Sequence, residues 1–211
     1  MRADALQILT TWFSPAYPVG AYSYSHGLEW AVEAGWVRDG DGLRRWTADL
    51  MHFGAGRSDA ILLVRAMEAD DPAPLAELAA ALAPSAERLL ETAAQGAAFA
   101  RTTSAVWGLA VPAMPYPVAV GHAARLLGLP LRETVTLFVQ GFAANIVSAG
   151  VRLVPLGQTE GQAISAALLP LAAAVADDAL TSPVEAVGGS AVAADIAAML
   201  HETQYSRLYR S

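Results

Sequence analysis

Long segments rich in alanine and leucine dominate this chain, and no stretch shows the sustained polar–apolar alternation of a half-buried strand. Both residue types favour helix. Hydrophobic residues make up 55% of the sequence and charged residues only 16%, so much of the chain must be buried in a core or against partners. A single core suffices for 211 residues. We therefore expect an all-α, single-domain fold over residues 1–211, an irregular bundle of about ten helices.

The apolar periodicity and the start and stop signals predict where these helices lie. Ser182, Pro183 and Glu185 combine an N-cap, a proline at the first helical position and an acid at the third, which predicts a helix start. Thr159 and Gln162 form a weaker capping box. The expected helices are 2–12, 25–35, 41–53, 57–69, 74–82, 85–107, 117–127, 131–150, 160–176 and 183–209.

The segment 13–30, which we call the opening block, reads FSPAYPVGAYSYSHGLEW and carries five aromatic rings. Its two prolines exclude a helix before about Gly20. Gly20 itself allows a positive φ, and Ser23 or Ser25 can cap the helix that follows. The simplest structural interpretation is a loop that folds back and tucks its rings under the first helix. This density of rings also suits a functional surface.

The residue types that are absent exclude several classes of chemistry. The chain has no cysteine, so disulfides, thiolate metal sites and cysteine nucleophiles are excluded. All thirteen basic residues are arginine, so a Walker A loop and Schiff-base catalysis are excluded as well. A net charge of −7 argues against binding nucleic acid.

The four histidines, at positions 26, 52, 122 and 201, do not have the spacing of a metal site. None lies three or four residues from another, and the adjacent pair His201–Glu202 points in two directions on a helix. We expect buried or interfacial histidines and predict no metal, no cofactor and no catalytic residue. A two-fold dimer that pairs equivalent histidines stays open.

Two uncharged stretches come close to the length of a membrane span. Residues 102–124 are interrupted by three prolines, and residues 134–151 contain Gln140 and Asn145. The polar N-terminal segment does not have the pattern of a signal peptide. We therefore expect buried helices of a soluble cytoplasmic protein.

Three motifs carry a resemblance to a known family. The pattern SP-x-x-P-x-G-x-x-SYSHGLE in the opening block, the stretch RLVPLGQTEGQ at 152–162 and the C-terminal HETQYSRLYRS at 201–211 resemble UreF, a subunit of the urease nickel-insertion chaperone. The motifs lie at both ends and in the middle of the chain. Tyr22 and Tyr209 stand where the family pattern leads us to expect phenylalanine, a change that keeps the ring.

The resemblance implies a non-catalytic scaffold that binds UreD (also called UreH) and recruits the GTPase UreG to the urease apoprotein. It also implies a homodimer, with nickel carried by a partner. The residues expected to bind partners come from all three motifs. They are Ser25, His26 and Glu29 in the first; Arg152, Gln158 and Gln162 in the second, toward UreG; and Tyr205, Arg207, Leu208, Tyr209 and Arg210 in the third, toward UreD.

The tail 201–211 is rich in tyrosine and arginine, which dominate interface hot spots. Tyr205, Leu208 and Tyr209 lie at i, i+3 and i+4, so we expect a helical tail with one apolar stripe. With little of its own protein to pack against, such a stripe should be disordered until a partner binds.

Two other functions are weighed against the scaffold. A small helical enzyme would need an organised constellation, and no G-x-S-x-G elbow or metal motif is present. A membrane-associated nickel transport component would need uninterrupted spans, which the prolines argue against.

Overall fold

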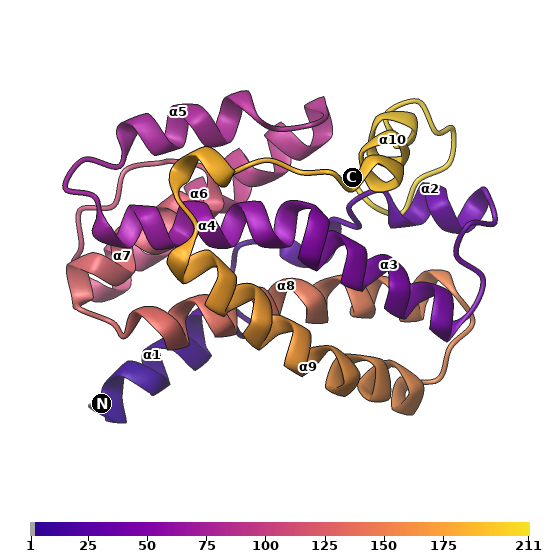
Figure 1. Cartoon of the computed structure of the whole chain (residues 1–211), viewed down its shortest axis with the longest axis horizontal. Helices are drawn as coiled ribbons and strands as arrows, with labels where there is room; N and C mark the ends of the chain where they lie inside the picture. Colours follow the sequence, from indigo (N-terminus) through magenta and orange to yellow (C-terminus); the bar gives the residue numbers. More distant parts are fainter. Residues whose placement is uncertain (1–2) are drawn as a thin grey trace.

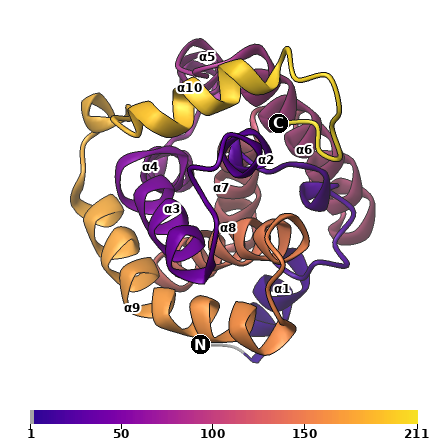
Figure 2. The same cartoon turned by 90° about the vertical axis from the view of Figure 1, so that its right-hand side faces the viewer.

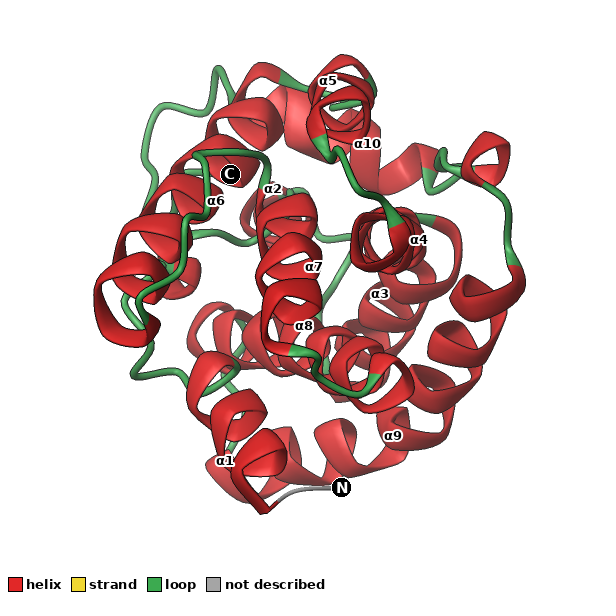
Figure 3. Cartoon of the chain, turned by 90° about the vertical axis from the view of Figure 1, so that its left-hand side faces the viewer, coloured by secondary structure: helices red, strands yellow, loops and turns green. Residues whose placement is uncertain are grey.

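The computed structural model describes residues 3–211, which form ten α-helices and two 3₁₀ turns, and Figure 3 shows no strand in this part of the chain. The all-α prediction is therefore confirmed. In chain order the elements are α1 (Ala3–Trp12), η1 (Ala21–Ser23), α2 (Leu28–Glu33), α3 (Gly40–Phe53), α4 (Ala55–Glu68), α5 (Ala73–Ala81), α6 (Ala86–Trp107), α7 (Tyr116–Leu127), α8 (Leu131–Leu153), α9 (Gln158–Thr181), η2 (Val184–Ala186) and α10 (Val192–His201).

The core forms around α4, which packs against α3, α7, α8 and α9 (Figure 1). Viewed along the long axis, α2, α3, α4, α7 and α8 lie in the centre, and the remaining helices surround them (Figure 2). Helix α4 is suited to this position because a continuous run of its residues, 60–64, is buried. The core is therefore a helix-on-helix core, as the alanine-rich composition predicts.

Helices α8 and α9 are long and apolar enough to cross a membrane by length and hydropathy alone. Half of the most apolar window of α8 is buried inside the fold, and a third of that of α9. These are the two stretches where a core helix and a membrane span have similar composition, and here both pack against α3 and α4.

The predicted helix 183–209 is wrong. Instead, the 3₁₀ turn η2 and a loop precede the short helix α10, which ends at His201. Arg57 holds this loop: its Nε lies 2.7 Å from a carboxylate oxygen of Asp178, and its Nη1 donates to the Ala186 carbonyl at 2.9 Å. The local start signal at Ser182 is overridden because these tertiary contacts satisfy the loop's polar groups. The capping box at Thr159 is also wrong, because α9 begins at Gln158 with no side-chain cap.

The opening block is not helical between residues 13 and 20, as its prolines predict. Two of its rings pack on α6 and α8. Tyr17 is buried, shares a hydrogen bond with Thr103 Oγ1 at 2.7 Å and has its ring 5.7 Å from that of Phe99 in α6. The ring of Phe13 lies 6.0 Å from that of Phe138 in α8. Tyr22 is exposed. The chain folds back as predicted, but the prediction that the rings lie under the first helix is wrong, because Tyr17 and Phe13 contact α6 and α8 instead.

Gly20 has φ +76°, so the predicted left-handed turn is confirmed. A Cβ at this position would meet no atom within 4 Å, so any cost of a larger residue comes from the backbone alone. Gly20→Ala should lower the free energy of unfolding by about 1 kcal/mol in urea titrations.

The matched control is Gly141→Ala, inside α8, where the nearest atom to a new Cβ lies 3.7 Å away. Alanine is preferred over glycine in a helix interior, so this variant should gain about 0.5–1 kcal/mol. Equal stability of the Gly20 variant and the wild type would show that the left-handed turn carries no strain.

Candidate functional site

The tail 201–211 folds back onto the opening block and α2, and one carboxylate anchors it. Glu29 accepts the backbone N–H of Leu208 at 2.7 Å and of Tyr209 at 2.9 Å. Glu29 is only 6% exposed. Because a buried carboxylate is costly unless hydrogen-bonded, these two amides and Glu29 stabilise each other.

The end of the tail is held by Ser23 and Ser25 of the opening block. The Ser25 backbone N–H donates to the Ser211 carbonyl at 2.7 Å, and the Ser25 hydroxyl donates to the same oxygen. The Arg210 N–H donates to the Ser23 carbonyl at 2.8 Å. The Ser25 hydroxyl also accepts the N–H of Glu29 in the first turn of α2, so it serves both helix and tail.

His201, the last residue of α10, is fully buried between two carboxylates. Its Nε2 lies 3.1 Å from an oxygen of Glu29, and its Nδ1 lies 2.6 Å from an oxygen of Glu87. Arg207 donates to the other oxygen of Glu87 at 2.7 Å, so Glu87 joins His201 to a residue of the tail.

The turn at His26 and Gly27, which leads from Ser25 into α2, has unusual backbone geometry. His26 has φ +54° and is the only non-glycine residue with positive φ in the described chain, residues 3–211. Gly27 follows with φ +73°, and a Cβ there would lie 2.7 Å from the backbone nitrogen of Ala198 in α10. Glycine is therefore required for α10 to reach this turn. Strained backbone of this kind persists where surrounding contacts over-determine it.

A buried charged cluster lies beneath the turn. Arg88 forms an ion pair with Glu91, whose other oxygen lies 3.0 Å from Nε2 of His26. Burial would raise the pKa of Glu91, but the charge of Arg88 and the contact with His26 outweigh it and lower that pKa to about 2. Burial, assisted by the charge of Arg88, lowers the pKa of His26. Ser211 Oγ donates to Glu91 at 2.9 Å, which joins this cluster to the tail.

The prediction of a helical, self-unsupported tail is wrong. No residue after His201 is helical, and the amides of residues 208–210 donate to Glu29 and to the Ser23 carbonyl instead of to preceding carbonyls. Tyr209 and Ser211 are buried in the chain's own core. Tyr205 and Leu208 are instead exposed, with 105% and 81% of their reference surface accessible, so the predicted stripe is divided between two sides.

The second motif forms a groove. Arg152, Gln158 and Gln162, which sequence spacing places near one another, line a cavity of about 420 Å³ between α8 and α9. Small residues such as Ala144 and Gly161 form its walls. All three predicted side chains are exposed, and so are accessible to a partner.

Arg152 connects the groove to the tail. Its guanidinium lies over the ring of Tyr209, 5.2 Å from the ring centroid, and its Nη2 donates to the Tyr22 carbonyl at 3.4 Å. Burial raises the pKa of Tyr209, opposed by Arg152. The three motifs thus meet at one place, although more than a hundred residues separate the first from the other two.

The predicted binding residues of the first motif lie inside this assembly. Ser25, His26 and Glu29 are all buried and bind a segment of their own chain; their part in partner binding stays a prediction. His26 and His201 are buried, as expected, whereas His52 is exposed. Within residues 3–211 no group of three His, Cys, Asp or Glu side chains is placed to hold a metal ion.

Sequence reasoning missed Glu87, Arg88 and Glu91, which hold His201, His26 and the tail. A weak signal was present: Glu87 and Glu91 lie four residues apart and so share one face of α6. The residues around Glu87 and Glu91 in the sequence do not distinguish a buried helix face from a solvent-exposed one.

Glu29→Gln should release the tail. The substitution removes the charge that two tail amides and His201 share, and breaking a buried charged network costs about 3 kcal/mol. Hydrogen exchange followed by mass spectrometry should show faster exchange in residues 205–211, and urea titration should show the lost stability. Glu133→Gln is the matched control, because Glu133 is an exposed glutamate in the first turn of α8, outside the tail and its anchor. Unchanged exchange in the Glu29 variant would contradict this anchoring role.

Asp59 lies next to this cluster, and its raised pKa should make the free energy of unfolding depend on pH. Burial raises its pKa from 3.8 to about 6, with Arg88 opposing. Between these values the folded protein holds a proton that the unfolded chain has released, so this contribution to stability falls as the pH rises. Asp59→Asn should therefore be more stable than the wild type by about 2 kcal/mol near pH 8 and equal near pH 4. A constant difference across this range, measured by urea titration, would contradict the assignment.

Comparison with known proteins agrees with the motifs. The UreF family profile matches residues 37–169. A urease accessory protein UreF from Cereibacter sphaeroides strain KD131 is 56% identical over 207 residues, covering 98% of this chain and 99% of the relative. The proteins of the same name from Roseobacter denitrificans and Rhodopseudomonas palustris are 49% and 48% identical; each alignment covers 100% of this chain and, respectively, 96% and 95% of the relative. The profile spans more than half of the chain and the relatives nearly all of it, so the chain belongs to the UreF family.

Proposed function

We propose that this protein is a scaffold of urease maturation that binds UreD through its tail and α10 and recruits UreG through the groove between α8 and α9. The single observation that carries the proposal is the divided tail: Tyr209 and Ser211 are anchored in the core, while Tyr205 and Leu208 are presented to solvent. As a member of the UreF family the chain is an accessory protein and not a catalyst.

The proposed UreD surface continues from the tail onto α10. Four apolar residues recur on one exposed face of this helix at i, i+4, i+7 and i+8: Val192, Ile196, Met199 and Leu200. The carboxylate of Glu202 accepts the N–H of Ala86, which holds the end of α10 at the start of α6. Leu90, one turn further along α6, is 60% exposed. Exposed apolar surface of this extent is typical of a protein interface.

The proposed UreG surface is different in character. Arg152, Gln158 and Gln162 provide a guanidinium and two amides, which suit hydrogen bonds to a partner's carboxylates and backbone. Since the Arg152 guanidinium lies over Tyr209, the conformation of the tail affects this surface as well. We infer that UreD binding at the tail influences UreG binding at the groove through this contact.

We further propose that the scaffold acts in the cytoplasm as a two-fold homodimer, with nickel carried by a partner. The absence of cysteine from the sequence supports the last point, because it removes thiolate ligands. A dimer would present two copies of each surface.

Replacing both Tyr205 and Leu208 by alanine should abolish co-purification with UreD and urease activation. Both side chains are exposed, so the free energy of unfolding should change by less than about 0.5 kcal/mol. This is a sharper test than truncation, because deleting the tail also removes the buried Tyr209. Leu126→Ala, at a half-exposed position near the end of α7, is the matched control. Wild-type UreD yield with the double variant would refute the tail as the anchor.

Replacing Arg152, Gln158 and Gln162 by alanine should weaken UreG recruitment while UreD still co-purifies. The two glutamine changes are at exposed positions and should cost little stability. Because Arg152 also lies over Tyr209, a variant with only the two glutamines replaced separates groove binding from tail contacts. Undiminished recruitment by both variants would show that UreG binds elsewhere.

A further inference from the structure

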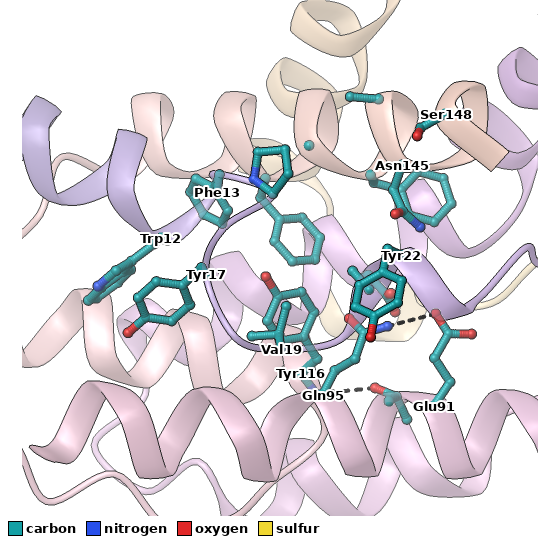
Figure 4. Close-up of a pocket in the computed structure, with 18 of the residues that line it drawn as sticks. Trp12, Phe13, Tyr17, Val19, Tyr22, Glu91, Gln95, Tyr116, Asn145 and Ser148 are labelled. Atoms are coloured by element: carbon teal, nitrogen blue, oxygen red, sulfur yellow. Dashed lines mark hydrogen bonds between the residues drawn. The ribbon is translucent and has the colours of Figure 1, made fainter. Parts of the chain in front are cut away.

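A second cavity, of about 220 Å³, lies beneath the opening block, between it and α4, α6, α7 and α8 (Figure 4). Its lining includes the aromatic rings of Trp12, Phe13, Tyr17, Tyr116, Phe138 and Phe142. An apolar protein cavity of about 150 Å³ is large enough for benzene, so this one has room for a six-membered ring with a polar head.

The charged groups at the base of this cavity do not balance. Arg88 is paired with Glu91, and the oxygens of Glu91 also meet Nε2 of Gln95 at 2.9 Å and of His26 at 3.0 Å. Burial and the charge of Arg88 lower the pKa of His26, so its ring is neutral near pH 7. Arg88 thus faces two carboxylates, Glu91 and Asp59, so the cavity lining carries one excess negative charge, and Asp59 is the more weakly paired of the two.

Asp59 has no hydrogen-bond partner among residues 3–211, and its nearest cation is Nη2 of Arg88 at 3.9 Å. Its side chain is 19% exposed. Asp59 also contributes to raising the pKa of Tyr116, after the larger effect of burial, which places its charge near that ring. A carboxylate so enclosed and so poorly paired is unusual, since buried charges are normally hydrogen-bonded.

We propose that this cavity binds a small organic cation, an amidinium or ammonium group carried on an aromatic or short aliphatic body. The faces of the surrounding rings attract cations. The carboxylate of Asp59 supplies the counter-charge, which an uncharged aromatic ligand would leave unpaired and an anion would oppose.

The arrangement of the walls offers a path for entry. In Figure 4 Trp12 and Tyr17 lie at one end of the cavity, and Tyr22, Asn145 and Ser148 lie at the other. Tyr22 is 67% exposed, so its ring can move without loss of core packing. The exposed end is therefore the side at which a ligand would pass.

The test compares three probes of nearly the same shape: benzamidine, which is a cation; benzamide, which is neutral; and benzoate, which is an anion. Nitrogen-labelled protein is titrated with each, and the indole N–H of Trp12 is followed by two-dimensional NMR. Trp46 is the internal control, because its indole nitrogen is equally buried and unpaired but lies outside the cavity. Benzamidine should shift the Trp12 signal saturably and leave that of Trp46 in place, with benzamide and benzoate at least about tenfold weaker.

Asp59→Asn should weaken benzamidine binding by about tenfold or more, and binding to the wild type should weaken as Asp59 is protonated on acidification below about pH 6. Asp195→Asn is the matched control: Asp59 and Arg88 line both this cavity and its neighbour, whereas Asp195 lines only the neighbour, so equal effects of the two substitutions would indicate binding there. Equal affinity for benzamidine and benzamide, a Trp12 signal that does not move, or equal effects of the two variants would each overturn the proposal.

Discussion

The carboxylate of Glu29 is the interaction on which the arrangement of the three motifs depends. It receives two backbone amides of the tail, and with Glu87 it encloses the ring of His201. A buried carboxylate with these partners is stable, whereas one without them is costly. Glu29 therefore holds the tail and the end of α10 against the opening block. The exposed positions of Tyr205 and Leu208 depend on this anchoring.

This dependence extends into the core through α6. Glu91, one turn beyond Glu87, accepts the hydroxyl of Ser211 and also meets His26 and Arg88. A change in the charge or position of these groups acts on the tail as well. Glu91 lines the proposed cation cavity and also binds the end of the tail that carries the proposed UreD surface, so we expect ligand binding in the cavity to affect UreD binding.

On the protein surface, Arg152 is the residue that connects the tail to the groove. It belongs to α8, lines the groove with Gln158 and Gln162, and covers the ring of Tyr209 with its guanidinium. The two proposed partner surfaces are thus neighbours. In the proposed scaffold the connection between the two surfaces consists of one side chain, Arg152, lying over one buried ring, that of Tyr209.

The sequence by itself determined the helical class, nearly all helix positions up to residue 181, the left-handed turn at Gly20 and the residues of the α8–α9 groove. These features depend on composition, on periodicity or on residues close together in the chain, so local rules suffice for them. Only the tertiary structure decided the course of residues 183–211 and the partners of His201. Each of those outcomes depends on a group more than a hundred residues away, Arg57 for the loop and Glu29 for the tail. Buried charges pair by proximity in space, which no local pattern records.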